Sequence, residues 1–167
     1  MDNALLFIIV IMVVLVIAVF LPRWIRRSSR SAGDRASQRY TERRRSEILD
    51  ALSRTVVVHA PESVVREIVD TAVLQQPRRF SALSDGGYGI RFVEPDDAVA
   101  RLVDDPQGTR LQLDRFREYL GIPNTSASWA ELRTRVSEAA VARGLTAHDG
   151  PAAAHRRDPE TERWNIV

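Results

Sequence analysis

Histidine and paired aspartates are the side chains of this sequence that could support acid–base or metal chemistry. His59, His148 and His155 are the three histidines, and no two of them have the i, i+4 spacing that places metal ligands on one helix face. The acidic pairs at 96–97 and 104–105 lie at expected turns, where aspartate is favoured because it binds nearby backbone N–H groups. The sequence contains neither cysteine nor lysine, which excludes thiolate ligands, cysteine nucleophiles and Schiff bases. We therefore expect a protein that is not an enzyme and that binds no cofactor or metal.

The segment 55–145 has the pattern of a small α+β domain. TVVVHA predicts a β-branched strand, and the apolar residues of PESVVREIVDTAVLQQ then recur at helical spacing. Two pairs of short strands follow, RRFSAL with YGIRFVE around the turn SDGG, and DAVARLVD with TRLQLDRFRE around DPQG. SASWAELRTRVSEAAVARG predicts an amphipathic helix that ends at Gly144. The order β-α-β-β-β-β-α indicates a small antiparallel sheet with helices packed on one face.

The start of this segment, TVVVHAPESVVREIVDTAV, resembles the first strand and helix of the helix-grip superfamily, the START-related and polyketide cyclase-like proteins. The hairpin-rich sheet that leads into a long helix ending in Ala-Arg-Gly is similar too. The resemblance covers residues 55–145 and implies a shortened helix-grip domain, whose curved sheet grips the last helix around a cavity for an apolar ligand. The alternative is an unrelated α+β domain with a solid core.

An apolar run precedes the domain. Residues 4–21 are eighteen residues without a polar side chain, and at ~1.5 Å per residue they span about 27 Å, close to the ~30 Å hydrocarbon core of a bilayer. A cleaved signal peptide fits less well, because the start MDN is acidic and the run ends in FLPRW. The pattern predicts a single transmembrane anchor within residues 1–25.

Arginines follow the anchor and predict its orientation. Residues 23–45 contain nine arginines and two acids, whereas the rest of the chain is net acidic. Positive charge close to a membrane end stays in the cytoplasm, so we expect the N-terminus outside and the C-terminal domain inside the cell membrane. Charge confined to this segment indicates anionic lipid headgroups and not nucleic acid. The expected membrane-interface residues are Arg23, Trp24, Arg26, Arg27 and Arg30.

The remaining segments connect or extend the domain. Residues 26–40 are typical of a flexible basic linker, and residues 41–54 predict a juxtamembrane helix. Residues 146–167 are rich in Pro, Ala and charge, which predicts a largely disordered tail. The apolar end of this tail could dock onto its own domain, or join a partner as an added strand. The candidate partner-binding residues are therefore Trp164, Ile166 and Val167.

These patterns together predict a single-pass, membrane-anchored protein, and the arginine-, alanine- and valine-rich composition favours a bacterial source. We expect its cytoplasmic α+β domain to act as an adaptor that binds a protein partner at the membrane. A carrier of lipid or another apolar ligand, of helix-grip type, is the alternative. A membrane-associated enzyme is the third hypothesis, and it would require polar groups that converge in a cavity.

Overall fold

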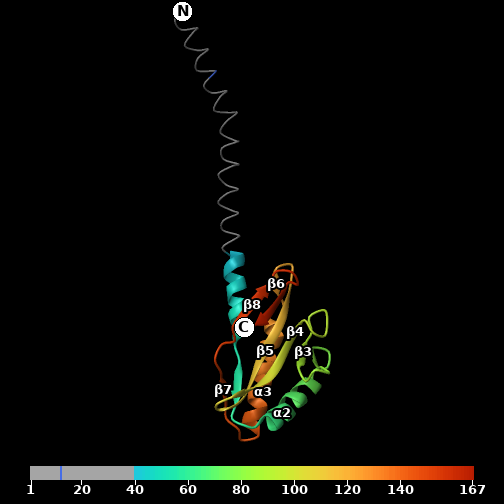
Figure 1. Ribbon diagram of the computed structural model, residues 1–167, viewed down its shortest axis with the longest axis vertical. Helices are drawn as coiled ribbons and strands as arrows, with labels where there is room; N and C mark the ends of the chain where they lie inside the picture. Colours follow the sequence, from blue (N-terminus) through green and yellow to red (C-terminus); the bar gives the residue numbers. More distant parts are fainter. Residues whose placement is uncertain (1–11, 13–39) are drawn as a thin grey trace, which may run out of the picture. The chain divides into compact units, whose positions relative to one another are not determined.

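The computed structural model describes residue 12 and residues 40–167. The chain divides into two compact units, Met1–Arg44 and Arg45–Val167, and the second unit contains the folded domain (Figure 1). None of the described helices has the length and apolar character needed to cross a bilayer. The predicted anchor, except Met12, and most of the predicted linker lie outside the described residues, as do the expected membrane-interface residues Arg23, Trp24, Arg26, Arg27 and Arg30.

The domain has the predicted α+β architecture. Its helices cover residues 40–53, Glu62–Leu74 (α2) and Ser126–Ala142 (α3). The described chain forms one nine-stranded antiparallel sheet. The strands are β1 (Val56–Val58), β2 (Phe80–Ala82), β3 (Tyr88–Ile90), β4 (Ala98–Asp105), β5 (Gly108–Tyr119), β6 (Ile122–Pro123), β7 (Ala147–Asp149), β8 (His155–Asp158) and β9 (Arg163–Ile166).

β5 is the central strand of the sheet. One of its sides pairs with β4 along most of its length. On the other side β1 pairs with residues 109–111 and β9 pairs with residues 115–117. β1 is short, and β9 pairs with the part of β5 that lies beyond it. Strands from the two ends of the domain sequence therefore pair with the same side of β5 (Figure 1).

The helices cover one face of this sheet. Val56 and Val58 on β1 and Leu111 and Leu113 on β5 share one buried cluster with side chains of α2 and α3. Trp129 of α3 is fully buried there, and its indole N–H donates to the backbone oxygen of Arg54 over 3.0 Å. We call this side of the sheet the inner face and the opposite side the outer face.

A β-bulge changes which residues of β5 point inward. Leu113 pairs with Ala100, but the next pair joins Arg115 to Val99, so Asp114 is an extra residue. One extra residue reverses the alternation of side chains beyond it. Phe116 and Glu118 are consequently buried on the inner face, whereas without the bulge Arg115 and Arg117 would occupy those positions.

Local signals placed the elements well. The hairpins around SDGG and DPQG form as β2–β3 and β4–β5. Pro61 precedes α2 with φ −60°, and Gly144 follows α3 with φ +74°, where a left-handed residue commonly ends a helix. The first helix of the domain runs over residues 40–53, against the predicted 41–54.

The tail differs from the predicted disorder at residues 146–167. β7 pairs with β1, and the β8–β9 hairpin pairs with β5. The physical reason is that β1 covers only the first part of β5, so the backbone groups of residues 115–117 need another strand. The helix-grip resemblance implied that α3 is the last element, whereas three strands follow it.

Candidate functional site

A buried carboxylate marks the place where the N-terminal helix, β5 and the C-terminal hairpin meet. Glu118 lies near the end of β5 on the inner face, and its side chain is only 1% exposed. Charged groups are expensive to bury unless they are paired and hydrogen-bonded. Its partners define what we call the Glu118 cluster, which consists of Arg45, Glu118, Arg157 and Trp164.

Three donors from three different segments satisfy this carboxylate. Arg45 Nη2 of the first helix donates to Glu118 Oε1 over 2.7 Å. Arg157 Nε on β8 donates to Oε2 over 3.0 Å, and the indole N–H of Trp164 on β9 donates to Oε1 over 2.9 Å. The cluster therefore joins the helix that leads from the predicted anchor to the last strands of the chain.

Two of the three candidate partner-binding residues, Trp164 and Ile166, lie against their own domain. Trp164 stacks on Phe116, with ring centroids 5.8 Å apart and planes inclined by 11°, and the Arg45 guanidinium lies 5.8 Å from the Trp164 ring. Ile166 is half-buried opposite His155 on β8. The side chain of Val167 is exposed, although its backbone N–H donates to Ala154 O. Trp164 and Ile166 thus contribute to the sheet itself, and Val167 is the one of the three that remains open to a partner.

His155 is the first residue of β8, in the same C-terminal hairpin. Its Nε2 lies 3.0 Å from the backbone oxygen of Leu113, and its ring contacts the Phe116 ring edge-on at 5.1 Å. Burial lowers the pKa of His155 below 6.5, against the opposing effect of its backbone hydrogen bonds. The neutral ring therefore donates its proton to Leu113 O in the folded domain. The other two histidines, His59 and His148, meet edge-on at 5.0 Å.

Acidification should destabilise the domain through His155. In the unfolded chain the His155 side chain takes up a proton near the ordinary histidine pKa of 6.5. In the folded domain the buried ring has a lower pKa, so it stays neutral to a lower pH. The stability contributed by the neutral ring is therefore complete above that pH, and it is lost as the pH falls toward the folded pKa. Urea unfolding of the wild type and of His155→Gln between pH 7 and pH 5 measures this, and we expect a flatter pH dependence for the variant. An equal pH dependence in both proteins would contradict this role of His155.

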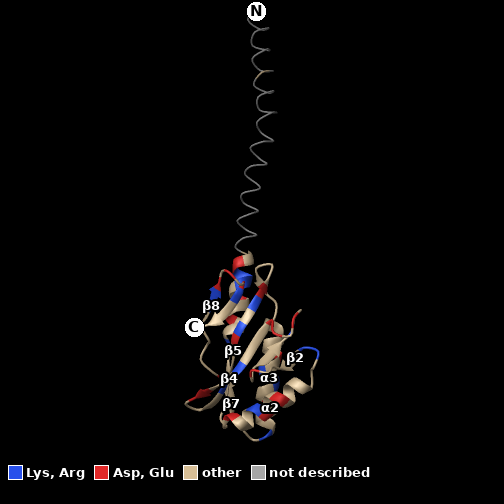
Figure 2. Cartoon of the chain, turned by 45° about the vertical axis from the view of Figure 1, so that its right-hand side comes forward, with Lys and Arg blue, Asp and Glu red and all other residues tan. Residues whose placement is uncertain are grey.

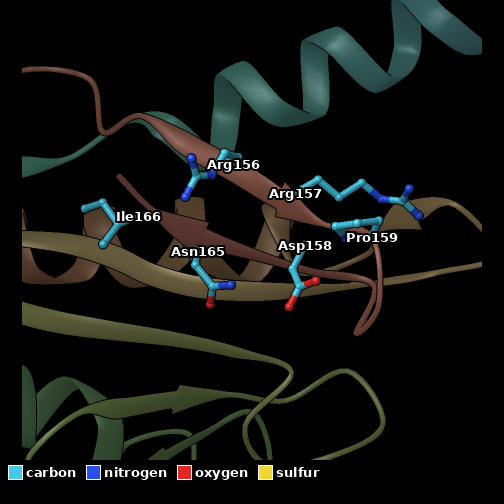
Figure 3. Close-up of a pocket in the computed structure, with 6 residues that line it drawn as sticks. All are labelled: Arg156, Arg157, Asp158, Pro159, Asn165 and Ile166. Carbon is cyan, nitrogen blue, oxygen red and sulfur yellow. The ribbon is translucent and has the colours of Figure 1, made fainter.

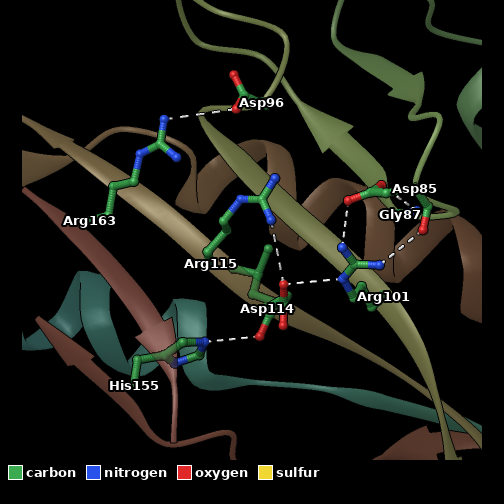
Figure 4. A network of polar contacts seen from close by, with 9 residues as sticks. Asp85, Gly87, Asp96, Arg101, Asp114, Arg115, His155 and Arg163 are labelled. Atoms are coloured by element: carbon green, nitrogen blue, oxygen red, sulfur yellow. Dashed lines mark hydrogen bonds and ion pairs between the residues drawn. The ribbon is translucent and has the colours of Figure 1, made fainter. Parts of the chain in front are cut away.

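Basic and acidic residues lie along β4 and β5 (Figure 2), and ion pairs join several of them on the outer face (Figure 4). Arg101 on β4 bridges Asp114 on β5, over 3.1 Å, and Asp85 in the β2–β3 turn. Arg115 lies 3.8 Å from Asp114, and Arg163 on β9 lies 4.0 Å from Asp96. The backbone N–H of Gly87, and then Arg101, lower the pKa of Asp85. The outer face is thus a half-exposed surface of alternating charge carried by β4, β5 and β9.

A shallow polar pocket adjoins this surface at the last hairpin (Figure 3). Arg156 and Asn165 are paired across β8 and β9, and both belong to the pocket wall. A guanidinium beside an amide offers donors for a carboxylate or another small anion. The pocket has a volume of 300 Å³ and is lined by Arg156, Arg157, Asp158, Pro159, Asn165 and Ile166.

Asp97 organises the loop after β3. Its Oδ2 accepts the backbone N–H groups of residues 92–94 over 2.6–3.3 Å, and its Oδ1 accepts the hydroxyl of Tyr119. Burial by itself would raise the pKa of Asp97, but these donors lower it overall. The expectation that the acidic pair at 96–97 serves a turn therefore agrees with the geometry at Asp97.

Large side chains fill the space between the sheet and its helices. Trp129, Tyr88, Phe80 and Leu132 are all buried there, and Tyr88 donates its hydroxyl to Asp70 over 2.9 Å. An apolar depression of 390 Å³ opens on the surface between α2 and β2, where Leu74 and Phe80 contribute to its wall. Among the described residues, no group of three or more His, Asp or Glu side chains could hold a metal ion.

Sequence patterns did not reveal the Glu118 cluster. Arg45, Glu118 and Arg157 are far apart in the chain, and Glu118 occupies an inner-face position only because of the bulge at Asp114. The apolar Trp164 in a charged tail was an available signal, because this residue lies on β9 and donates to Glu118.

Comparison with known proteins gives no relative. No protein-family model matches the chain, and no curated protein or solved structure matches it either.

Proposed function

We propose that this chain is a single-pass, membrane-anchored bacterial protein whose cytoplasmic domain is a protein-interaction module. The observation that carries the proposal is the run of eighteen apolar residues at 4–21 followed by an arginine-rich segment. A run of this length suits a bilayer, and the arginines favour retention of the following residues in the cytoplasm. The domain then works at the membrane surface.

The interior of the domain supports an adaptor over a carrier. A carrier of helix-grip type needs a cavity between sheet and last helix, but Trp129 and Leu132 of α3 are fully buried against the sheet at that place. The outer face supplies a polar surface instead, because Arg101, Arg115 and Arg163 are each about a third exposed beside their acidic partners. Charged surfaces of this kind contribute specificity and association rate in protein recognition.

One feature favours the second candidate, an apolar-ligand or lipid-binding domain. The depression between α2 and β2 has an apolar wall that includes Val73, Leu74 and Phe80. Its 390 Å³ falls within the size range of small-molecule sites. A ligand would bind there at the surface, and not within the sheet–helix interior that the helix-grip resemblance implies.

Affinity purification of the full chain from solubilised membranes tests the proposal, with both proteins and lipids identified. The first variant replaces Arg115, Arg156 and Arg163 by alanine on the outer face. The matched control replaces Arg54, Arg66 and Arg143, which pair with acids at helices. We expect the wild type and the control to retain the same protein partner and the outer-face variant to lose it. A stoichiometric lipid or small apolar molecule in all three samples, without a protein, would overturn the adaptor and favour the carrier.

A further inference from the structure

An apolar side chain occupies an unusual position at the turn between β5 and β6. Tyr119 pairs with Ile122, so Leu120 and Gly121 form a two-residue hairpin loop. Both have positive φ, 53° and 78°, as a type I′ turn requires. Asn, Asp and Gly are preferred there because a bulky L-residue is strained at positive φ. Leu120 is nevertheless leucine, and it is 102% exposed. The Leu120 side chain therefore makes no packing contact that would offset the strain of its backbone.

Two more exposed apolar residues belong to the adjoining loop. Phe92 is 51% exposed and Val93 is 58% exposed. The Phe92 ring lies 5.5 Å from the Tyr119 ring. The Asp97 carboxylate accepts hydrogen bonds from the backbone N–H of Phe92 and from the hydroxyl of Tyr119, so it holds the two residues in place. We call Phe92, Val93, Tyr119 and Leu120 the apolar tip. Because Asp97 holds its two loops together, the apolar tip is an ordered surface.

The apolar tip lies where the chain enters the domain. Arg45 is the first residue of the compact unit, and it binds Glu118, the direct neighbour of Tyr119. Residues 22–44 separate Arg45 from the end of the apolar run at Leu21. Twenty-three residues reach at most about 80 Å, and only about 35 Å if they are helical. The tether therefore joins the folded domain at Arg45, whose partner Glu118 is next to Tyr119 of the apolar tip.

We propose that the apolar tip inserts into the headgroup–acyl boundary of the bilayer to which the chain is anchored. The inference rests on the proposed membrane anchorage. Apolar and aromatic side chains partition into this boundary, and phenylalanine and leucine bury there to a depth of about 5–10 Å. Of the carboxylates near the apolar tip, Asp96, Asp97 and Glu118 are paired within the domain, and Glu94, next to Val93, is exposed. Acids accompany the arginines at this end, so the contact is apolar, and it forms on neutral lipid as well as on anionic lipid.

Lipid-borne spin labels test the insertion in the full chain. The chain has no cysteine, so Leu120→Cys carries a single fluorescent probe. Val141→Cys on α3 is the matched control, because this apolar side chain is exposed and lies outside the depression between α2 and β2. In phosphatidylcholine liposomes with spin label at the headgroup boundary, we expect at least about threefold greater fractional quenching at 120 than at 141. Circular dichroism checks that each labelled protein is folded.

A second variant separates insertion from folding. Leu120→Asn is favoured in a type I′ turn, so the thermal midpoint should stay equal or rise. A probe at Val93→Cys should nevertheless be quenched less in this background than beside Leu120, because an inserting side chain is lost. A lowered midpoint with unchanged quenching at 93 would show that Leu120 serves the fold, and would overturn the proposal.

Alkaline extraction of the same liposomes distinguishes this inference from the proposed function. A chain that resists extraction but shows quenching at 120 no greater than at 141 keeps its anchor and overturns insertion of the apolar tip. A chain that alkali releases but whose probe at 120 is selectively quenched while bound supports insertion and overturns the anchor. Release without selective quenching overturns both.

Discussion

Deleting residues 161–167 should lower the free energy of unfolding of the domain by about 4 kcal/mol. The deletion removes β9, and with it the strand that pairs with residues 115–117 of β5. It also removes Trp164, which stacks on Phe116 and donates to Glu118. Truncation of a buried tryptophan costs about 3–5 kcal/mol, and half-burial of Trp164 lowers that figure while the lost strand pairing raises it. Chemical denaturation of the full chain in detergent micelles, followed by tryptophan fluorescence and circular dichroism, measures the change.

The outcome decides between an ordered and a disordered end of the chain. Val167→Ala is the matched control, since its side chain is exposed, and it should change the unfolding free energy by less than about 0.5 kcal/mol. Trp164→Ala alone should give more than half of the effect of the deletion. If the deletion has no more effect than the Val167 control, then β9 does not complete the sheet and Glu118 lacks Trp164 as its third donor.

Replacing Glu118 by alanine should cost about 3 kcal/mol of stability. The change leaves two guanidinium groups and an indole N–H without their shared acceptor. Removing one partner of a buried ion pair typically costs about 3–5 kcal/mol. The side chains of Arg45 and Arg157 are 37% and 39% exposed, so water compensates them in part and the lower end of that range applies. Denaturant unfolding at pH 7 gives the value.

Two further variants show where this energy arises. Glu118→Gln keeps an acceptor for Trp164 but loses the charge, so it should cost about half as much as the alanine variant. Asp50→Ala removes an exposed carboxylate 3.5 Å from Arg54 and should cost less than about 0.5 kcal/mol. An equal, small loss for Glu118→Ala and Asp50→Ala would show that the Glu118 cluster does not hold the first helix to the hairpin.

Local chemistry explains what the sequence predicted correctly. Gly86 takes φ +79° in the β2–β3 turn, and β4 and β5 flank a turn at Asp-Pro-Gln-Gly. Both signals lie within a few residues of the structure they specify. The helices α2 and α3 have apolar residues at helical spacing and a proline or glycine at one end. Both signals are local, so they can be recognised without knowledge of distant residues.

Long-range pairing explains what the sequence did not reveal. β8 and β9 have few apolar residues. They form strands because β1 is short and leaves residues 115–117 of β5 free to pair with β9. The bulge at Asp114 has no turn residue to signal it, yet it decides that Glu118 points inward. Composition alone suggested disorder for 146–167, because charge and proline are also abundant in disordered chains.

The Glu118 cluster fixes the first helix to the last hairpin of the domain. The helix that carries Arg45 continues into Ile48, Leu49 and Leu52, which pack against the core. Leu52 is fully buried. A partner that binds the outer face on β9 would therefore contact the same hairpin to which the first helix is fixed.

Membrane topology is the most direct test of the central claim that the domain is a membrane-anchored cytoplasmic module. Since the chain has no cysteine, Asn3→Cys and the exposed Ala152→Cys each provide a single reporter. Intact cells are treated with a membrane-impermeant maleimide before and after permeabilisation. We predict labelling of residue 3 in intact cells and of residue 152 only after permeabilisation. Labelling of residue 152 in intact cells, or release of the chain from the membrane fraction by alkali, would contradict the account.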